Sequence, residues 1–228
     1  MKIAIVGYGK MGHEVETCAK EAGIAVSQVF DLSDDLKQAS FSKDEVVIEF
    51  TTPESCVKNL ENLLSKRVAV VCGTTGWYDQ IPYIRDLTHK HSGSVLYASN
   101  FSIGVHLFWQ TLHYLSTKIE KYPSYDIHMK EVHHIQKKDK PSGTARTSME
   151  IIRNANPHIK NIPIECYREG DAFGDHHVFF ESSVDSLELT HKAKSRQGFA
   201  MGAIECAKWL THKKGFFSID DYIKEKLS

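Results

Sequence analysis

Residues 2–12 read Lys2-Ile3-Ala4-Ile5-Val6-Gly7-Tyr8-Gly9-Lys10-Met11-Gly12, an apolar run followed at once by the pattern G-x-G-x-x-G. The run predicts a buried strand, and a helix is predicted from about residue 10 to residue 22. Glycines between a strand and a helix allow a sharp turn and a close approach of the backbone to a pyrophosphate. The free N–H groups at the start of the helix would bind the negative charge of that pyrophosphate. We therefore predict that Gly7, Tyr8, Gly9, Lys10, Met11 and Gly12 bind a dinucleotide. A glycine-rich turn without a ligand is the alternative.

The same alternation of strand and helix continues through the first half of the chain. Further strands are predicted at residues 25–30, 46–50, 68–72 and 94–98, with helices opening at Pro53 and after Gly76. Alternating strands and helices are typical of a parallel sheet with helices on both faces. The pattern thus predicts an α/β, Rossmann-like, doubly wound sheet.

The pattern changes after Phe101. A helix is predicted at residues 105–119, and the strands predicted after it are 125–134, 162–169, 176–182 and 186–193. Strands that follow one another favour an inserted α+β domain with a mixed or antiparallel sheet. Helices at residues 200–210 and 219–227 are expected to pack back on the first domain. We therefore expect a dinucleotide-binding domain of residues 1–102 plus 197–228, and a substrate-binding domain of residues 103–196.

Composition limits the classes of partner. The 228 residues are 41% hydrophobic and 25% charged, with a formal net charge of -1, which are ordinary values for a globular protein. Such a charge argues against non-specific binding to nucleic acid or to an anionic membrane. The apolar runs are short, and no secretory signal precedes them. We expect a cytoplasmic protein whose partners are small molecules.

Cysteine and histidine patterns argue against a metal site. The five cysteines are widely spaced, without a C-x-x-C pair: Cys18, Cys56, Cys72, Cys166 and Cys206. They are expected to be reduced and mostly buried, and they offer no zinc pattern. His133 and His134 are neighbours on a predicted strand, so their side chains should point to opposite faces. No metal is predicted.

An acidic residue suggests which dinucleotide is used. Asp31 ends the second predicted strand nineteen residues beyond Gly12, where a carboxylate usually accepts the ribose hydroxyls of NAD. Leu32 and Ser33 offer no cation for a 2′-phosphate, although Lys10 leaves NADP open. The alternative is that Asp31 only caps a turn.

Two loops are expected to line the nicotinamide side of the cleft. Gly73, Thr74, Thr75 and Gly76 follow one predicted strand, and Ser99, Asn100, Phe101 and Ser102 follow the next. Both lie at the carboxyl edge of the sheet, where ligands of open α/β folds gather. Ordinary connecting loops would look much the same.

Residues 131–144 combine proton carriers with an anion-binding turn. His133 and His134 can titrate near neutrality, and Lys137 supplies a cation. Ser142, Gly143 and Thr144 precede a predicted helix, whose electropositive start could bind a carboxylate. A dicarboxylate could place its second group on His134 or Lys137. The alternative is an ordinary capping turn at Ser142 or Thr144.

With these motifs the chain resembles the 4-hydroxy-tetrahydrodipicolinate (dihydrodipicolinate) reductases over nearly its whole length. The resemblance is carried by residues 7–12, 73–76 and 99–105, by the block 131–145, and by residues 168–176 and 191–203. It implies reduction of 4-hydroxy-tetrahydrodipicolinate to tetrahydrodipicolinate, with loss of water, in lysine and diaminopimelate biosynthesis. Hydride would pass from NADH or NADPH to C4 of a cyclic imine dicarboxylate. The chain is shorter than common family members between Asp31 and Val46, and Leu32 replaces an arginine that some members carry.

The resemblance also implies roles for single residues. His133 matches the family's proton donor or acceptor, Lys137 its proton donor, and His134 a substrate-binding histidine. The turn at Ser142, Gly143 and Thr144 matches the one that holds a substrate carboxylate. Family members are typically homotetramers that assemble through the sheet of the second domain.

Two other functions stay open from the sequence. One is a different dinucleotide oxidoreductase on the same scaffold, such as an amino-acid or semialdehyde dehydrogenase. The other is a regulator that senses NAD(H) without turnover. The H-H-x-x-K block at residues 133–137 favours the reductase over the first, and the lack of a basic helix or charged tail disfavours a DNA-reading regulator.

Overall fold

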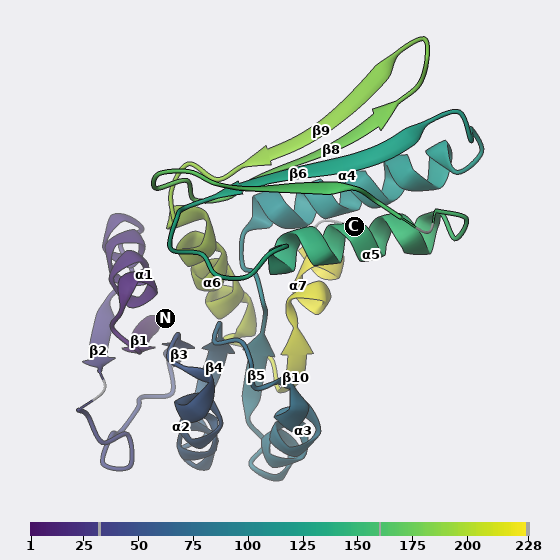
Figure 1. Cartoon of the computed structure of the whole chain (residues 1–228). Helices are drawn as coiled ribbons and strands as arrows, with labels where there is room; N and C mark the ends of the chain where they lie inside the picture. Colours follow the sequence, from purple (N-terminus) through teal and green to yellow (C-terminus); the bar gives the residue numbers. More distant parts are fainter. Residues whose placement is uncertain (32, 160, 227–228) are drawn as a thin grey trace. The chain divides into compact units, whose positions relative to one another are not determined.

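The computed structural model describes residues 1–31, 33–159 and 161–226 (Figure 1). The expectations that involved Leu32 and Leu227 lie outside these residues. The chain forms two compact units, residues 1–102 with 197–228 and residues 103–196. Among the described helices, none has the length and apolar character that crossing a bilayer requires.

The first unit contains a six-stranded sheet in the order β10-β5-β4-β3-β1-β2, with every neighbouring pair parallel. Its strands are β1 (Lys2–Val6), β2 (Val26–Phe30), β3 (Glu45–Glu49), β4 (Ala69–Cys72), β5 (Ser94–Tyr97) and β10 (Gly215–Ser218). All five residues of β3 are buried, as a central parallel strand covered on both faces requires. The predicted Rossmann-like sheet is confirmed.

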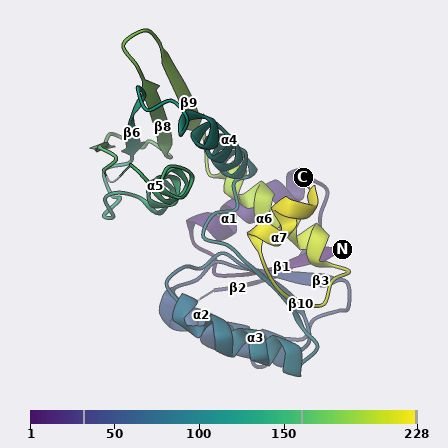
Figure 2. The ribbon, with the colours of Figure 1, turned by 90° about the vertical axis from the view of Figure 1, so that its right-hand side faces the viewer.

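Helices cover both faces of this sheet. They are α1 (Lys10–Glu21), α2 (Pro53–Ser65), the short 3-10 helix η1 (Tyr78–Gln80), α3 (Ile81–Lys90), α6 (Gln197–Leu210) and α7 (Ile219–Lys226). Figure 2 shows α2 and α3 on one face, with α1, α6 and α7 on the other. Leu60, Leu63 and Leu64 of α2 pack in one core with Val70 and Val95 of the strands.

Strand β10 was not predicted from the sequence. It has only four residues, Gly215-Phe216-Phe217-Ser218, and two lysines precede it, so it carries no clear alternating signal. Its residues pair with β5 in parallel register. Tertiary pairing, rather than local pattern, makes this segment a strand.

The second unit is a four-stranded mixed sheet in the order β7-β6-β8-β9. Its strands are β6 (Asp126–His133), β7 (Ile164–Arg168), β8 (Asp175–Glu181) and β9 (Ser186–Lys192). Strand β6 pairs with β7 in parallel and with β8 in antiparallel register. Helices α4 (Ile103–Ile119) and α5 (Gly143–Ala155) share a core with one face of this sheet. The predicted α+β insertion with a mixed sheet is confirmed.

Candidate active site

The glycine loop of the first unit meets the steric demands of its pattern. Gly7 has φ +92°, and a Cβ there would lie 2.0 Å from the carbonyl oxygen of Phe50. A Cβ at Gly12 would lie 2.2 Å from the carbonyl oxygen of Gly7, so only glycine lets α1 pack this closely on the loop. A Cβ at Gly9 would meet nothing within 4 Å. The loop is therefore closely packed against the protein at Gly7 and Gly12, and it is open to a ligand at Gly9.

The start of α1 is suited to an anion. Gly9 is the N-cap residue, no side chain hydrogen-bonds there, and the first turn contains no acidic residue. The first N–H groups of an α-helix have no partner within the helix, so they can bind a phosphate. Lys10 is exposed and Met11 is half-buried at this turn. The Tyr8 hydroxyl donates to Glu16 Oε2 at 2.5 Å, which fixes the Tyr8 ring against α1.

A cavity of about 290 Å³ lies beside the glycine loop. Its lining comes from the ends of β1, β2 and β3 and from α2: Val6, Gly7, Tyr8, Gly9, Phe30, Asp31, Asp34, Leu36, Phe50, Thr51, Thr52, Ser55 and Asn59. The backbone N–H of Asp31 donates to Asp34 Oδ2 at 2.7 Å. Asp34, not Asp31, thus supplies the carboxylate that caps this turn, and Asp31 lines the cavity.

The two further loops predicted to bind cofactor meet the β3 loop at the carboxyl edge of the sheet. Thr74 is buried, and its Oγ1 accepts from the Thr51 N–H at 2.7 Å. A Cβ at Gly73 would lie 2.0 Å from the Phe50 ring, which also makes an edge contact with Phe101 at 6.0 Å.

The remaining residues of these two loops differ in exposure. Thr75 and Ser99 are exposed, whereas Ser102 is buried and its N–H donates to Asn100 Oδ1 at 2.8 Å. Thr74 and Phe101 are therefore buried beneath the carboxyl edge of the sheet, and Thr75 and Ser99 expose polar groups at that edge.

A buried carboxylate organises the site of the second unit. Glu131 is 0% exposed, and its Oε2 accepts from the Ser142 N–H at 3.1 Å. The same carboxylate lies 3.2 Å from Arg168 Nη2 and 3.7 Å from His133 Nδ1. Glu131 and His133 are two positions apart on β6, so both face the same side of the sheet. Burial opposes ionisation of Glu131, but the hydrogen bonds from Ser142 hold its pKa below the ordinary value.

Arg168 connects this carboxylate to the loop that carries Lys137. Its Nε donates to the Lys137 carbonyl oxygen at 3.1 Å, and its Nη2 donates to the Asp139 carbonyl oxygen at 2.5 Å. The planar guanidinium can bind several acceptors in a fixed geometry, so it holds the loop in one conformation. Lys137 Nζ pairs with Asp139 Oδ1 at 2.9 Å, and the lysine side chain keeps 24% of its surface exposed.

His133 is 7% exposed and lies in a group of imidazoles. Its ring contacts that of His176 at 5.1 Å, and a Cβ at Gly174, where φ is +131°, would lie 3.1 Å from His133 Nε2. Burial lowers the pKa of His133, and Lys137 and Arg168 lower it further against the opposing effect of Glu131. Burial, with a contribution from His133, lowers the pKa of His176 to about 3. His176 is therefore neutral near pH 7.

The predicted carboxylate-binding turn begins α5. Ser142 is its N-cap, and the Ser142 Oγ accepts from the Ala145 N–H at 3.2 Å. Ser142 is 2% exposed, whereas Gly143 is exposed with nothing within 4 Å of a Cβ there. Thr144 and His134 are both half-buried. The capping role proposed as an alternative for Ser142 is thus present, and Gly143 is the more accessible position for a ligand.

Five residues of this network were not assigned a role from the sequence: Glu131, Asp139, Arg168, Gly174 and His176. The parallel β6–β7 register sets His133 opposite Arg168, and the antiparallel β6–β8 register sets Glu131 opposite His176. Neither register could be read from one sequence. The alternation of β8, in which His176, Val178 and Phe180 are buried, was the available signal that His176 faces inward.

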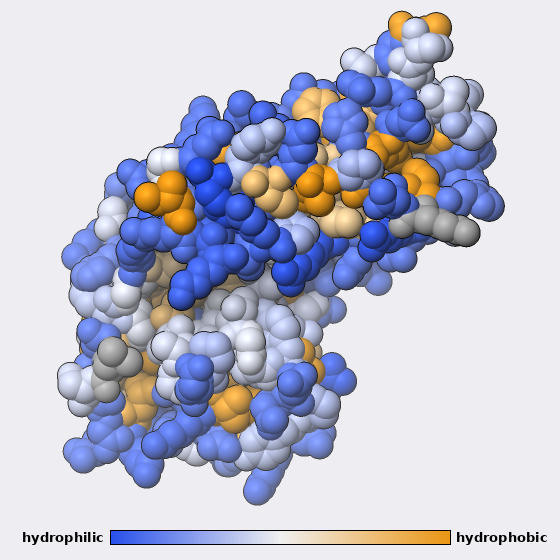
Figure 3. Space-filling model, in the orientation of Figure 1, coloured by the Kyte–Doolittle hydropathy of each residue, from blue (hydrophilic) through white to orange (hydrophobic). Residues whose placement is uncertain are grey.

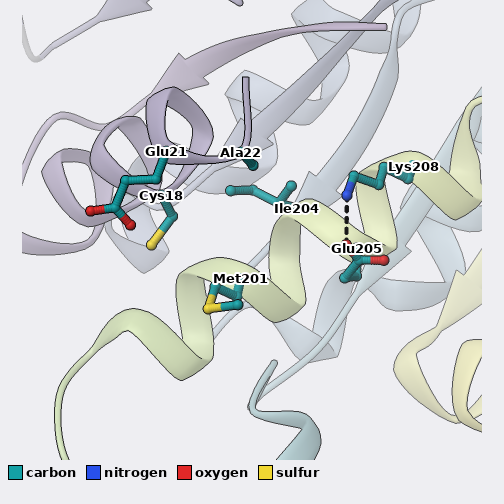
Figure 4. A pocket seen from close by; sticks show the side chains of 7 residues that line it. All are labelled: Cys18, Glu21, Ala22, Met201, Ile204, Glu205 and Lys208. Carbon is teal, nitrogen blue, oxygen red and sulfur yellow. Dashed lines mark hydrogen bonds and ion pairs between the residues drawn. The ribbon is translucent and has the colours of Figure 1, made fainter. Parts of the chain in front are cut away.

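A second cavity in the first unit, of about 230 Å³, lies between α1 and α6 (Figure 4). Figure 4 shows Ile204, Met201 and Cys18 in its lining, with an ion pair between Lys208 and Glu205 at 2.7 Å. The lysine and glutamate neutralise each other, and we assign no ligand to this cavity.

The Rossmann-like sheet with its glycine loop and the inserted mixed sheet define a two-unit oxidoreductase of the Rossmann class. Residues 1–101 match the family described as dihydrodipicolinate reductase, N-terminus, and residues 104–223 match dihydrodipicolinate reductase, C-terminus. The chain therefore belongs to the dihydrodipicolinate reductase family.

Relatives are similar over the full length of the chain. The chain is 38% identical to 4-hydroxy-tetrahydrodipicolinate reductase of Christiangramia forsetii, with 99% of this chain and 98% of the relative covered. It is 34% identical to the reductase of the same name from Archaeoglobus fulgidus, with 98% and 100% covered. Among solved structures, a dipicolinate-bound dihydrodipicolinate reductase from Paenisporosarcina sp. TG-14 has the same fold, with a TM-score of 0.75, 23% identity, and 96% and 97% of the two chains covered.

Proposed function

We propose that this chain reduces 4-hydroxy-tetrahydrodipicolinate to tetrahydrodipicolinate, with loss of water, at the expense of NADH or NADPH. The observation that carries the proposal is the network around Glu131. Glu131 lies close to His133 on the same strand and accepts a hydrogen bond from the Ser142 N–H at the start of α5. Its ion-pair partner Arg168 holds the loop that carries Lys137. A reductase that binds an anionic substrate and protonates it needs proton carriers and an anion-binding turn, and the network positions both. The relatives that cover nearly the whole chain bear the name of this reductase.

The cofactor is proposed to bind along the glycine loop and its cavity. The pyrophosphate would approach Gly9 and the N–H groups of α1, and Asp31 would accept the ribose hydroxyls. When bound, the reduced nicotinamide supplies hydride. Asp31 supports use of NADH, and Lys10, which is exposed at the glycine loop, is a cation that could bind the 2′-phosphate of NADPH.

The substrate is proposed to be held by its two carboxylates. One would bind at Gly143 and Thr144, where the α5 N-terminus is electropositive, and His134 would contact the other. The structural relative from Paenisporosarcina sp. TG-14 is described as bound to dipicolinate, which is also a cyclic dicarboxylate. That chemistry is consistent with the proposed anion sites.

Lys137 is proposed to deliver the proton that balances the transferred hydride. Hydride addition to a conjugated imine leaves electron density that a proton must quench, and an ammonium group both donates the proton and offsets the charge. His133 has a lowered pKa, so its imidazole is neutral near pH 7. It can therefore accept or relay a proton, but it is not the protonated donor at the beginning of the reaction.

Assembly as a homotetramer through the second sheet is also proposed. Helices α4 and α5 cover one face of this sheet, and the other face carries a stack of His128 on Phe179 at 4.7 Å and of His177 on Phe179 at 5.9 Å. Figure 3 shows the molecule from another side, on which apolar and hydrophilic residues are mixed. A sheet face that carries an aromatic ring between two imidazoles suits a subunit interface, and the mass in solution, measured by light scattering, tests it.

The function is tested by a coupled assay with purified protein. Substrate is made in situ from pyruvate and aspartate semialdehyde by a dihydrodipicolinate synthase, and oxidation of NADH and NADPH is followed separately. We expect oxidation that depends on the synthase. Oxidation of NADH or NADPH with aspartate semialdehyde alone would instead indicate an enzyme that reduces the free aldehyde. Reduction of NAD⁺ or NADP⁺ by aspartate semialdehyde would indicate a semialdehyde dehydrogenase, and tight NAD(H) binding without any turnover would indicate a sensor.

A further inference from the structure

Three buried groups of the first unit, which the proposed reaction does not use, lie within contact of one another. Glu49 ends β3, Cys56 lies in the first turns of α2, and Cys72 ends β4. All three are 0% exposed. The two Sγ atoms are 3.5 Å apart, and Glu49 Oε2 lies 3.6 Å from the Cys56 Sγ and 3.3 Å from the Cys72 Sγ.

The Glu49 carboxylate has an unusual set of partners for its depth. In the part of the chain that the structure describes, no lysine, arginine or histidine forms an ion pair with it. Its donors are the two thiols, which are weak, and the hydroxyl of Thr51. Buried carboxylates are normally paired with a cation or bind a metal ion. The position therefore lacks the positive charge that such a site usually contains.

The geometry of the three groups matches one face of a zinc tetrahedron. Zinc binds sulfur at about 2.3 Å and carboxylate oxygen at about 2.0–2.2 Å, which places ligands of one tetrahedron about 3.8 Å apart for two sulfurs and about 3.5–3.7 Å apart for sulfur and oxygen. The distances of 3.5, 3.6 and 3.3 Å differ from these values by about 0.4 Å or less. We propose that Glu49, Cys56 and Cys72 form a site for a thiophilic divalent cation, with Zn²⁺ as the expected ion.

Charge and access agree with this assignment. Binding of Zn²⁺ with release of both thiol protons leaves the formal charge of the cluster at its starting value, because two positive charges enter and two protons leave. Thr51 contacts Glu49 and accepts from Asn59 Nδ2 at 3.3 Å, and both residues line the cavity beside the glycine loop. Thr51 thus lies between the cluster and the cavity, and a water molecule or the Thr51 hydroxyl can complete the tetrahedron.

The assignment departs from the sequence expectation that the cysteines offer no zinc pattern. Cys56 and Cys72 are sixteen residues apart, and neither has a second cysteine or histidine at a zinc spacing. Parallel pairing of β3 with β4 sets Glu49 opposite Cys72, and α2 supplies Cys56 above them. The ligand set exists only in the folded chain.

The test uses the full chain, reduced and freed of metal with a chelator, and Cd²⁺ as the probe because thiolate-to-cadmium charge transfer absorbs in the ultraviolet. We expect one equivalent of Cd²⁺ to bind with the absorbance of two thiolates, and Zn²⁺ to displace it. Cys56→Ala and Cys72→Ala should each lose the two-thiolate signal, and Glu49→Gln should weaken binding at least about tenfold. Cys206→Ala, which removes another fully buried thiol of the same unit, should bind as the unchanged protein does.

The proposal is overturned if the unchanged protein gives no thiolate–cadmium absorbance. In that case Glu49 and the thiols form only a hydrogen-bonded core. It is equally overturned if Cys56→Ala and Cys72→Ala keep the signal, or if Cys206→Ala loses it to the same extent. Should the cluster variants fail to fold, cadmium NMR of the unchanged protein decides, because its chemical shift must report two sulfur donors. None of these measurements depends on reductase activity.

Discussion

Arg168 and Glu131, on the neighbouring strands β7 and β6, form an ion pair of 3.2 Å in which the carboxylate is fully buried. The arginine also binds the carbonyl oxygens of Lys137 and Asp139. One side chain therefore both compensates a buried charge and holds the loop on which the proposed proton donor lies. Stability and turnover are linked through this residue.

Arg168→Lys should separate these two effects. A lysine can keep the charge near Glu131 but cannot bind both loop carbonyls, so we expect the fold to survive and kcat to fall by about 10- to 100-fold. Arg168→Leu should in addition destabilise the protein by about 3–5 kcal/mol, because it leaves a buried carboxylate without a cation. Steady-state kinetics and urea unfolding measure both effects. Arg153→Lys, at an exposed position of α5, is the control and should change neither; an equal change there would remove the special role of Arg168.

Lys137→Ala tests the proton donor itself. We expect kcat to fall by about 10²- to 10⁴-fold, while the affinity for NADH, measured by fluorescence titration, stays near its normal value. The neighbouring Lys138 is exposed and offers a matched control, Lys138→Ala, which should keep normal turnover. Near-normal turnover of Lys137→Ala would show that another group delivers the proton.

Stability should fall as the pH is lowered below about 6.5, the ordinary pKa of histidine. Burial lowers the pKa of His176 in the folded chain to about 3, and it also lowers the pKa of His133. Between pH 6.5 and the lowered values the unfolded chain binds more protons than the folded chain, so acid favours unfolding by about 1.4 kcal/mol per pH unit for each such group. The lowered pKa of Glu131 acts in the same direction at lower pH, since its contribution is lost as the pH falls through its folded-state pKa.

Melting temperatures between pH 7 and pH 4 measure this dependence. His176→Gln should reduce the slope, because one buried group that resists protonation has been removed. His113→Gln, which changes an exposed histidine of α4, should leave the slope unchanged. A flat profile for the unchanged protein between these pH values would contradict the prediction.

Much of the architecture could be predicted because its signals are local. The strand Lys2–Val6, the glycine loop after it and Pro53 at the start of α2 each carry a short-range pattern, and each element occurs in the structure. The change from alternating to consecutive strands after Phe101 likewise predicted the inserted mixed sheet. Strand β10 was missed because four residues after two lysines acquire strand character only by pairing with β5.

The sites could be predicted only in part. His133, Lys137 and Ser142 lie in one segment, so their chemistry was visible in the sequence. The contacts that tune them depend on strand register: Arg168 reaches Glu131 across β6 and β7, and no local pattern sets that pairing. The association of Cys56 with Cys72 is missed for the same reason, because it depends on how α2 packs on β4.

Alanine at Gly9 and at Gly12 should have opposite consequences. Gly9 has open space at its Cβ position and φ of -81°, so Gly9→Ala should fold normally while the added methyl group hinders the proposed approach of the pyrophosphate. At Gly12 the Cβ would lie 2.2 Å from a carbonyl oxygen, so Gly12→Ala should destabilise the first unit by at least about 1–3 kcal/mol. Thermal unfolding and NADH titration distinguish the two, and normal NADH affinity in Gly9→Ala would count against the loop as the pyrophosphate site.

The cofactor preference should depend on Asp31. If its carboxylate accepts the ribose hydroxyls, then Asp31→Ala removes an interaction that NADH makes and that the 2′-phosphate of NADPH does not need, so kcat/KM should fall more for NADH than for NADPH. The turn itself should persist, because Asp34 supplies the carboxylate that binds the Asp31 N–H. Asp35→Asn, at an exposed position directly after this turn, is the control and should leave the ratio of the two cofactors unchanged. Parallel loss with both cofactors would mean that Asp31 only shapes the loop, and use of NADPH alone by the unchanged protein would refute its role as a ribose ligand for NADH.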